Sequence, residues 1–271
     1  MVSQLQPLNQ SEVIYPDSDG KPMANNTRQF GWIVVIQQNL DWLFADNRNV
    51  FVAGDLFWYP VEGRPNIVNT PDVMVVFGRS KGDRGSYQQW NEEEIAPQVV
   101  FEILSASNTQ DEMDKKLLFY ERHGVEEYYI YDPDSNRLRG WLRGDDGLDI
   151  IPQMVGWVSP RLGIQFAWSE EDLEIYRPDG ERFLTYVEIA KRFEEERQRA
   201  EEQRQRAEEE WQRAEEERQR AEQAEQARRD AIPRLLGMGL SVEQVAEALG
   251  LLVEEVQAIA KRCCFQQIAQ E

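Results

Sequence analysis

The sequence has very few side chains that bind metals through sulfur or imidazole. Its 271 residues include two cysteines, Cys263 and Cys264, and a single histidine, His123. The cysteines are adjacent near the C-terminus, so they provide neither a disulfide framework nor the ligand spacing of a zinc site. This cysteine usage indicates a reducing compartment.

Long apolar runs are absent as well. No segment approaches the roughly 18 consecutive apolar residues that indicate a membrane span. The first ten residues, MVSQLQPLNQ, lack both the basic segment and the apolar stretch of a signal peptide. We therefore expect a soluble cytoplasmic protein that does not contact membranes.

Basic residues are scarce relative to acidic ones. The chain carries 50 Asp and Glu against 30 Lys and Arg, a formal net charge of -20. Non-specific binding of nucleic acid needs Lys and Arg at the surface to neutralise phosphates. The balance argues against a basic coat, so any nucleic-acid chemistry must depend on a local groove or on metal ions.

Residues 1–187 have the pattern of a mixed α/β domain. Apolar residues at helical spacing predict a helix over residues 29–44. Pro- and Gly-containing stretches predict long loops over residues 60–71 and 78–97. A hairpin is expected over residues 173–185. β-rich runs predict five strands, over residues 50–59, 72–77, 99–104, 127–131 and 137–143.

A further helix is predicted between the strands 99–104 and 127–131. Thr109 and Glu112 have capping-box spacing at its start, and Gly124 stands where a helix would stop. A strand, a helix and a second strand at this spacing predict a βαβ-type unit with the two strands side by side.

The composition changes abruptly over residues 188–230, which are almost wholly Glu, Gln, Arg and Ala. Apolar residues recur there every seven positions, at Phe193, Ala200, Ala207, Ala214 and Ala221. The other seam position is mostly charged or polar, so a tight coiled coil is poorly encoded. Four Glu-first i,i+4 pairs instead predict a long solvated helix or a weak coiled coil used as a spacer: Glu195–Arg199, Glu202–Arg206, Glu209–Arg213 and Glu216–Arg220.

Residues 231–271 are predicted to form a small helical element. Ser241 and Gln244 have capping-box spacing, and apolar periodicity continues on both sides of Gly250. The order of these signals is similar to a helix-turn-helix. Glu254 and Glu255 would lie in the first turn of the recognition helix, where phosphates would repel them. An oligomerisation or docking role is therefore favoured over DNA binding by this element.

Two carboxylates stand in strands that are otherwise apolar. Glu102 lies within the run Val99–Leu104, whose pattern is typical of a strand buried on both faces, and Asp72 opens the similar run Asp72–Phe77. An unpaired buried carboxylate costs several kcal/mol or becomes protonated, so each needs a cation or strong donors. Structural salt bridges to arginine are the alternative, and Asp72 could instead be an exposed residue that begins its strand.

The helix between the strands offers a cation. Its inward face is marked by Met113, Leu117 and Tyr120. Lys116 lies within roughly 70° of the centre of this face, whereas Lys115 points almost directly away. We expect Lys115 to be solvated and Lys116 to lean toward the sheet and Glu102, unless Lys116 only extends from the edge of the face into water.

Two carboxylates and a lysine at one end of a sheet have a known chemical use. The carboxylates hold one or two Mg²⁺ ions, which prefer oxygen ligands. The metal polarises a phosphate and lowers the pKa of a bound water, while the lysine orients that water and offsets developing negative charge. The sequence therefore makes Asp72, Glu102 and Lys116 candidate catalytic residues.

The same residues carry a resemblance to a known family. The chain contains four ordered motifs: P-D-V-M-V-V (71–76), V-V-F-E-I-L-S-A-S-N-T (99–109), D-K-K-L-L-F-Y (114–120) and G-V-E-E-Y-Y-I-Y-D-P (124–133). In this order they resemble the Uma-two family of predicted endonucleases, common in cyanobacteria, within the PD-(D/E)XK restriction-endonuclease-like superfamily. The resemblance spans most of residues 10–185. It implies a mixed sheet flanked by helices.

The resemblance also assigns roles by position. Asp72 matches the acid of the PD motif and Glu102 the acid of the second motif. The lysine of that motif would be at position 104, which is Leu104 here. Family members supply the lysine from the following helix, where Lys116 is the match. The backbone carbonyl of Ile103 would complete the metal site, and Asp55 is a weaker acidic candidate. Asn26–Thr27 stands where many relatives carry His or Glu.

The expected function is therefore hydrolysis of DNA phosphodiester bonds by a magnesium-dependent or manganese-dependent endonuclease. The alternative is a catalytically silent nuclease fold that serves as a scaffold or interaction protein. In that case the helical tail would drive assembly. In either case we expect a homo-oligomer, associated through the C-terminal helices.

Overall fold

The computed structural model describes residues 13–18, 20, 24, 26–169 and 172–268, with side chains to residue 261. The polar residues 1–10 and the side chains of Cys263 and Cys264, on which part of the sequence argument rested, lie outside the described residues. The chain divides into two compact units, residues 1–190 and 191–271. The described helices include none that is long and apolar enough to cross a membrane.

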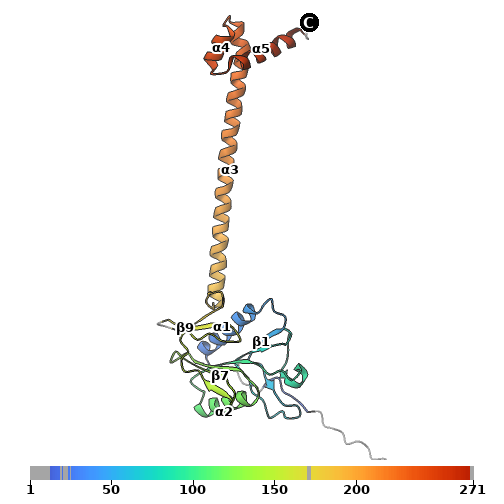
Figure 1. Ribbon diagram of the computed structural model, residues 1–271, viewed down its shortest axis with the longest axis vertical. Coiled ribbons are helices and arrows are strands. Elements are labelled where there is room, and N and C mark those ends of the chain that lie inside the picture. Colours follow the sequence, from blue (N-terminus) through green and yellow to red (C-terminus); the bar gives the residue numbers. More distant parts are fainter. Residues whose placement is uncertain (1–12, 19, 21–23, 25, 170–171, 269–271) are drawn as a thin grey trace, which may run out of the picture. The chain divides into compact units, whose positions relative to one another are not determined.

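The first unit is built on a mixed sheet (Figure 1). This sheet has six strands in the order β1-β3-β5-β6-β7-β8. Neighbouring strands are antiparallel except β5 and β6, which are parallel, as the predicted βαβ-type unit requires. The strands are β1 (Val50–Gly54), β3 (Val73–Phe77), β5 (Val99–Ile103), β6 (Glu127–Asp132), β7 (Arg137–Arg143) and β8 (Leu148–Ile150).

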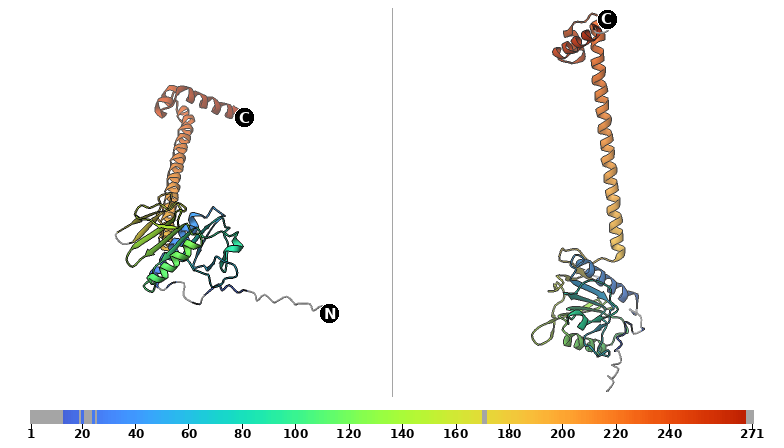
Figure 2. Two further views of the ribbon diagram at one scale, coloured as in Figure 1. Left: turned by 60° about the horizontal axis from the view of Figure 1, so that its bottom comes forward. Right: turned by 90° about the vertical axis from the view of Figure 1, so that its right-hand side faces the viewer.

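Two helices cover opposite faces of this sheet (Figure 2). Helix α1 (Thr27–Leu43) packs on one face through Ile33, Ile36 and Leu40. Helix α2 (Gln110–Arg122) packs on the other face through Met113 and Tyr120. Since side chains alternate along a strand, each central strand contributes to both hydrophobic cores. The continuous apolar runs in the sequence are explained by this double burial.

The ends of α2 follow the sequence signals. The side chain of Thr109 accepts a hydrogen bond from the backbone N–H of Glu112, and Gly124 adopts a positive φ of 92° just beyond the last turn. A residue with a side chain is strained at such an angle, so glycine favours a stop at this point. The predicted limits of α2 are confirmed.

The predicted strand over residues 50–59 is interrupted. Asp55 has a positive φ of 48°, which turns the chain away from the sheet after β1. The remaining residues form β2 (Trp58–Tyr59), which pairs in parallel with β4 (Tyr87–Gln88). The predicted loop 78–97 therefore contains a short strand and a 3-10 helix, Gln89–Glu92.

The predicted hairpin over residues 173–185 is only partly correct. Strand β10 (Leu173–Tyr176) pairs with the preceding β9 (Gln165–Trp168) in an antiparallel ladder. It also pairs briefly across the turn, through an antiparallel bridge between Tyr176 and Arg182 and backbone hydrogen bonds from Arg177 N–H to Glu181 O and from Phe183 N–H to Ile175 O. The turn at Gly180, with a φ of 85°, and this pairing agree with the prediction, but the longer pairing with β9 was not predicted.

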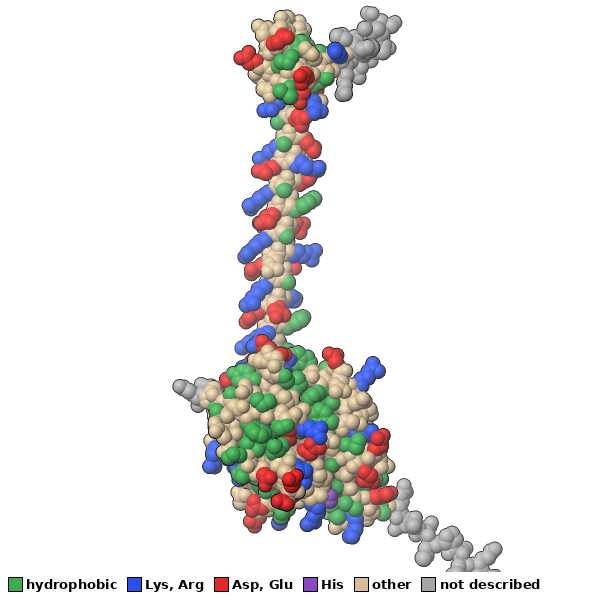
Figure 3. All heavy atoms as spheres, viewed as in Figure 1, with side chains coloured by type: hydrophobic (Ala, Val, Ile, Leu, Met, Phe, Trp, Pro, Cys, Tyr) green, Lys and Arg blue, Asp and Glu red, His purple; other side chains and the backbone are tan. Residues whose placement is uncertain are grey.

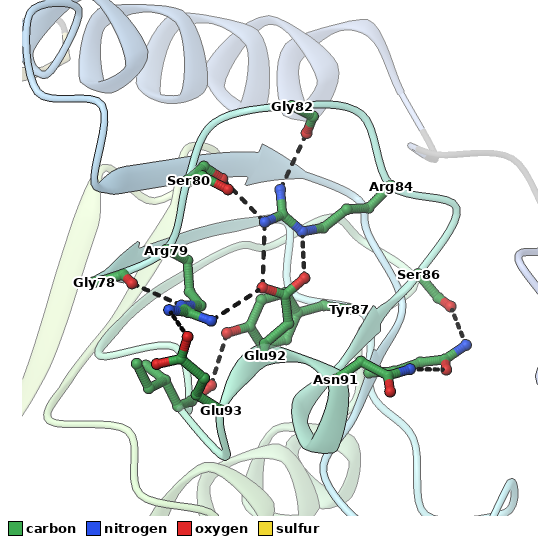
Figure 4. Close-up of polar contacts among 12 residues, drawn as sticks. Gly78, Arg79, Ser80, Gly82, Arg84, Ser86, Tyr87, Asn91, Glu92 and Glu93 are labelled. Carbon is green, nitrogen blue, oxygen red and sulfur yellow. Dashed lines mark hydrogen bonds and ion pairs between the residues drawn. The ribbon is translucent and has the colours of Figure 1, made fainter.

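Two glutamates in the loop after β3, Glu92 and Glu93, form ion pairs with arginines (Figure 4). Glu92 accepts from the Nε of Arg84 at 2.7 Å, and Glu93 pairs with Arg79 at 2.8 Å. The side chain of Arg84 is only 13 % exposed and stacks over the ring of Phe51 at 4.0 Å. These ion pairs therefore help to hold the loop.

Helix α3 (Tyr186–Gly237) covers the predicted charged segment and extends beyond both of its ends. All four predicted Glu–Arg pairs are present, with N–O distances of 3.5–3.9 Å. Their side chains are exposed, and each such pair stabilises a helix by about 0.3–0.5 kcal/mol. Figure 3 shows acidic and basic side chains interspersed along α3 with single apolar ones.

The second unit ends in two short helices, α4 (Val242–Leu249) and α5 (Val253–Ile268). The predicted capping box is complete, because Ser241 accepts from the N–H of Gln244 and the side chain of Gln244 accepts from the N–H of Ser241. Gly250 joins the helices in the left-handed region. A small core holds them against the end of α3, formed by Ile232, Val245, Ala246 and Val256.

Candidate functional site

Strand pairing brings the two predicted acids together. In the antiparallel pair of β3 and β5, Val73 lies opposite Phe101. One step further along the same register, Asp72 lies opposite Glu102, so both side chains emerge on the face that α2 covers. Asp72 is 8 % exposed and Glu102 is 2 % exposed. Asp72 is therefore a buried acid and not the exposed first residue of a strand.

Helix α2 holds the carboxylate of Glu102 through two side chains one turn apart. Lys116 Nζ donates to Glu102 Oε2 at 2.7 Å, and Tyr120 Oη donates to Oε1 at 2.5 Å. Lys116 also approaches the backbone carbonyl of Thr70 at 3.5 Å. Lys115 is exposed to solvent. The predicted difference between the two lysines is therefore confirmed.

Asp72 occupies the more constrained position of the two acids. Its Oδ2 accepts from the backbone N–H of Ile103 at 2.6 Å. Burial, and then the carboxylate of Glu102, raise the pKa of Asp72 well above its ordinary value. Lys116 and the Ile103 N–H act in the opposite direction but are outweighed. Asp72 thus favours a proton, or a cation in its place.

Both donors to Glu102 keep their protons at neutral pH. Burial lowers the pKa of Lys116, but the carboxylates of Glu102 and Asp72 more than offset this, and the pKa is raised overall. Burial, with a further contribution from Glu102, raises the pKa of Tyr120 well above its usual value. Lys116 therefore acts as a cation and Tyr120 as a neutral donor, and neither is a general base.

A glutamine from the other side of the sheet completes the group. Gln29, in the first turn of α1, is 5 % exposed and donates through Nε2 to the carbonyl of Ile103 at 2.8 Å. The Asn26–Thr27 segment lies just before it, with Asn26 capping α1 by accepting from the Gln29 N–H. Asn26–Thr27, which stands where many relatives carry His or Glu, therefore lies just before Gln29, whose side chain contacts the site.

Asp55 lies beside the two main acids. Its backbone N–H donates to the carbonyl of Asp72 at 3.2 Å, and its charge contributes to the raised pKa of Asp72. The turn that ends β1 is what brings it there. It therefore belongs to the neighbourhood of the site, as a lesser member.

These residues fit a hard divalent cation. The described residues contain no group of three or more His, Cys, Asp or Glu side chains able to hold a metal. Mg²⁺ does not need such a cage, because it keeps several waters and is held by one or two carboxylates plus substrate phosphates. The buried pair of Asp72 and Glu102 supplies the carboxylates. The Ile103 carbonyl has a second lone pair besides the one that Gln29 uses.

Replacing Asp72 by Asn should stabilise the metal-free protein at neutral and alkaline pH. The raised pKa of Asp72 means that its contribution to stability is present at low pH and is lost as pH rises through the folded-state pKa. The neutral amide does not ionise, so this stability is not lost, and its oxygen still accepts the hydrogen bond from the Ile103 N–H. We expect a thermal midpoint about 2–4 °C higher at pH 8, the shift produced by about 1 kcal/mol.

The pH dependence and the metal dependence provide the control for Asp72→Asn. At pH 4 the gain should shrink, because the wild-type carboxyl is then protonated. Added Mg²⁺ should raise the midpoint of the wild type but not that of the variant. Thermal unfolding in EDTA and in Mg²⁺ at both pH values measures this, and an equal gain at pH 4 and pH 8 would contradict the assignment.

Tyr120 and Gln29 were not identified as site residues from the sequence. Tyr120 follows Lys116 by four positions and was placed on the inward face of its helix, so its spacing was the available signal. Gln29 carried no such signal, because its contact joins residues 74 positions apart. Asp72, Glu102, Lys116 and Ile103 lie together, as the motifs implied.

Comparisons with known proteins concern mainly the first unit. The crystal structure of a putative nuclease from Anabaena variabilis is similar at 17 % identity and a TM-score of 0.38, covering 53 % of this chain and 78 % of the other. No curated protein matches the sequence. The sequence pattern of the Uma-two family, described as "Putative restriction endonuclease", matches residues 19–199. The match covers more than half of the chain, which therefore belongs to that family.

Proposed function

We propose that this protein is a magnesium-dependent or manganese-dependent endonuclease of the PD-(D/E)XK type that hydrolyses DNA phosphodiester bonds. The family's description supports a nuclease function. The observation that carries the proposal is the buried pair of carboxylates, Asp72 and Glu102, with Lys116 at 2.7 Å from Glu102. A structural salt bridge would need one carboxylate for one lysine, and here a second carboxylate is buried beside it.

The residues have separate roles in this proposal. Asp72, Glu102 and the Ile103 carbonyl would hold the metal, which when bound polarises the phosphate and lowers the pKa of a water. Lys116, kept cationic by its surroundings, orients the attacking water and offsets the negative charge that develops on the phosphate oxygens. The water oxygen forms a bond to phosphorus and the bond from phosphorus to the sugar oxygen breaks. The attacking water gives up a proton to solvent, and the leaving sugar oxygen takes one from solvent.

The chemistry can be local even though the whole chain is acidic. Many of its acidic residues lie on α3, where arginines pair with them along the helix. With Asp72 ionised, the charges of Asp72, Glu102 and Lys116 sum to a single negative charge, which one divalent cation would reverse. DNA binding would therefore depend on the metal more strongly than in a basic nuclease.

The direct test is cleavage of supercoiled plasmid and of single-stranded DNA by the purified full-length protein. Mg²⁺ and Mn²⁺ are titrated, with EDTA as the metal-free control. We expect nicked and linear products only with metal. Absence of cleavage of either substrate at every concentration of both metals would contradict the proposal and leave the scaffold function as the better account.

Exposed aromatic residues on α3 favour a second role, in assembly. Phe193 and Trp211 are 69 % and 67 % exposed and lie 18 residues apart, which is five helical turns and hence one face of the helix. Large apolar side chains on one face would be covered if that face met a second helix. We propose that the protein forms a homo-oligomer through a weak coiled coil that includes this face.

Replacing Trp211 by Glu should weaken this association. A carboxylate on this face would have to be buried or solvated on association, so we expect the mass measured by light scattering after gel filtration to fall toward that of the monomer. Gln212→Glu adds the same charge about 100° around the helix from this face and should leave the mass unchanged. A wild-type protein that is monomeric at all concentrations would exclude this role for α3.

A further inference from the structure

We propose that Tyr120 is a positioning residue that fixes the carboxylate of Glu102 for binding of the divalent cation. The inference rests on the proposed metal-dependent function but concerns a residue that would not touch the metal. Tyr120 would act through Glu102, in the way that hydrogen-bond partners behind metal ligands hold those ligands in position.

Tyr120 holds one of the two carboxylate oxygens of Glu102. Its hydroxyl donates to Glu102 Oε1 at 2.5 Å. Lys116 binds the other oxygen, Oε2, at 2.7 Å. Both donors come from one face of α2, so the helix holds the carboxylate by two points and fixes its rotation. About two of its four acceptor positions remain for a cation.

The ring of Tyr120 cannot easily move. It lies parallel to Trp58 with centroids 6.2 Å apart and meets the ring of Tyr128 edge-on at 4.9 Å. Tyr120 is fully buried. A donor held in this way keeps its direction. Without the hydroxyl, Glu102 Oε1 would be a buried acceptor with no donor, and the carboxylate would rotate or recruit water.

The structure also provides a matched control in Tyr128. Like Tyr120, it is fully buried, and it packs on the same aromatic cluster through Trp141 at 5.3 Å. Its hydroxyl has no hydrogen-bond partner among the described residues. The two Tyr→Phe substitutions therefore remove the same atom from the same core, but only one of them removes a hydrogen bond to Glu102.

The experiment measures Mn²⁺ binding to the full-length protein by calorimetry, for the wild type and for both variants. We expect Tyr120→Phe to weaken the Mn²⁺ affinity by about 10–100-fold, the usual effect of removing a partner behind a metal ligand. Tyr128→Phe should bind as the wild type does. Thermal unfolding of each variant, followed by circular dichroism, establishes that the binding is measured on folded protein.

The outcomes separate this inference from the proposed function. If the wild type binds Mn²⁺ and Tyr120→Phe binds it equally well, Tyr120 is a packing residue and the inference is wrong, whatever the cleavage assay shows. A weakened affinity in Tyr120→Phe supports the inference even if the wild type fails to cut DNA. If the wild type binds no Mn²⁺, the metal site and the role of Tyr120 are both overturned. An equal loss in Tyr128→Phe would also overturn the inference.

Discussion

The Glu102→Gln variant is expected to lose metal-dependent cleavage by at least about 10²-fold, the effect of removing one group that stabilises the transition-state charge. Glu102 is the carboxylate that Lys116 and Tyr120 both hold, and it lies opposite Asp72 on the same face of the sheet. Gln keeps the shape of the side chain but removes the charge that would bind the cation. Mn²⁺ binding should fall together with cleavage.

Glu127→Gln is the matched control for this loss. Glu127 is also a fully buried glutamate in a central strand, and it accepts from the hydroxyls of Ser159 and Tyr129 and from the backbone N–H of Arg161. These bonds tie a loop to β6, so the substitution should lower stability by about 1–3 kcal/mol without affecting cleavage per folded molecule. Undiminished cleavage by folded Glu102→Gln would exclude Glu102 as a metal ligand.

The positions of the acids could be predicted because their signals are local. Glu102 interrupts an apolar run. Because a strand buried on both faces has no contact with solvent, its carboxylate needs a cation or hydrogen-bond donors nearby. The parallel pairing of β5 and β6 followed from one helix with clear limits between two strands. Periodicity, capping residues and burial of continuous runs act over a few positions, and they determine most of the first unit.

The contacts that were not predicted from the sequence follow no spacing rule. Gln29 reaches Ile103 from the opposite helix, and β10 pairs over more residues with β9 than with the segment across its own turn. The arginines that hold Glu92 and Glu93 come from the same loop, yet no spacing rule links them. Such contacts depend on the path of the backbone in space, which a single sequence does not encode as a pattern.

Substitutions of Lys115 and Lys116 distinguish an effect on catalysis from an effect on metal binding. Replacing Lys116 by Met should reduce cleavage by about 10²–10³-fold, because the cation that offsets charge in the transition state is lost. Removal of the lysine charge leaves the buried carboxylates of Asp72 and Glu102 without the cation that α2 supplies. Their attraction for a divalent ion increases, so Mn²⁺ affinity should be unchanged or higher. Glu102→Gln, by contrast, should lose both cleavage and Mn²⁺ affinity.

Lys115→Met makes the same change one residue away, on the exposed side of α2. It should leave both cleavage and Mn²⁺ binding unchanged, because Lys115 points away from Glu102. Cleavage rates at saturating metal and calorimetric Mn²⁺ affinities for the two variants measure the difference. If Lys116→Met lost metal affinity in parallel with cleavage, the lysine would be a structural support of the metal ligands. If Lys116→Met cut DNA as fast as Lys115→Met, Lys116 would have no part in the reaction.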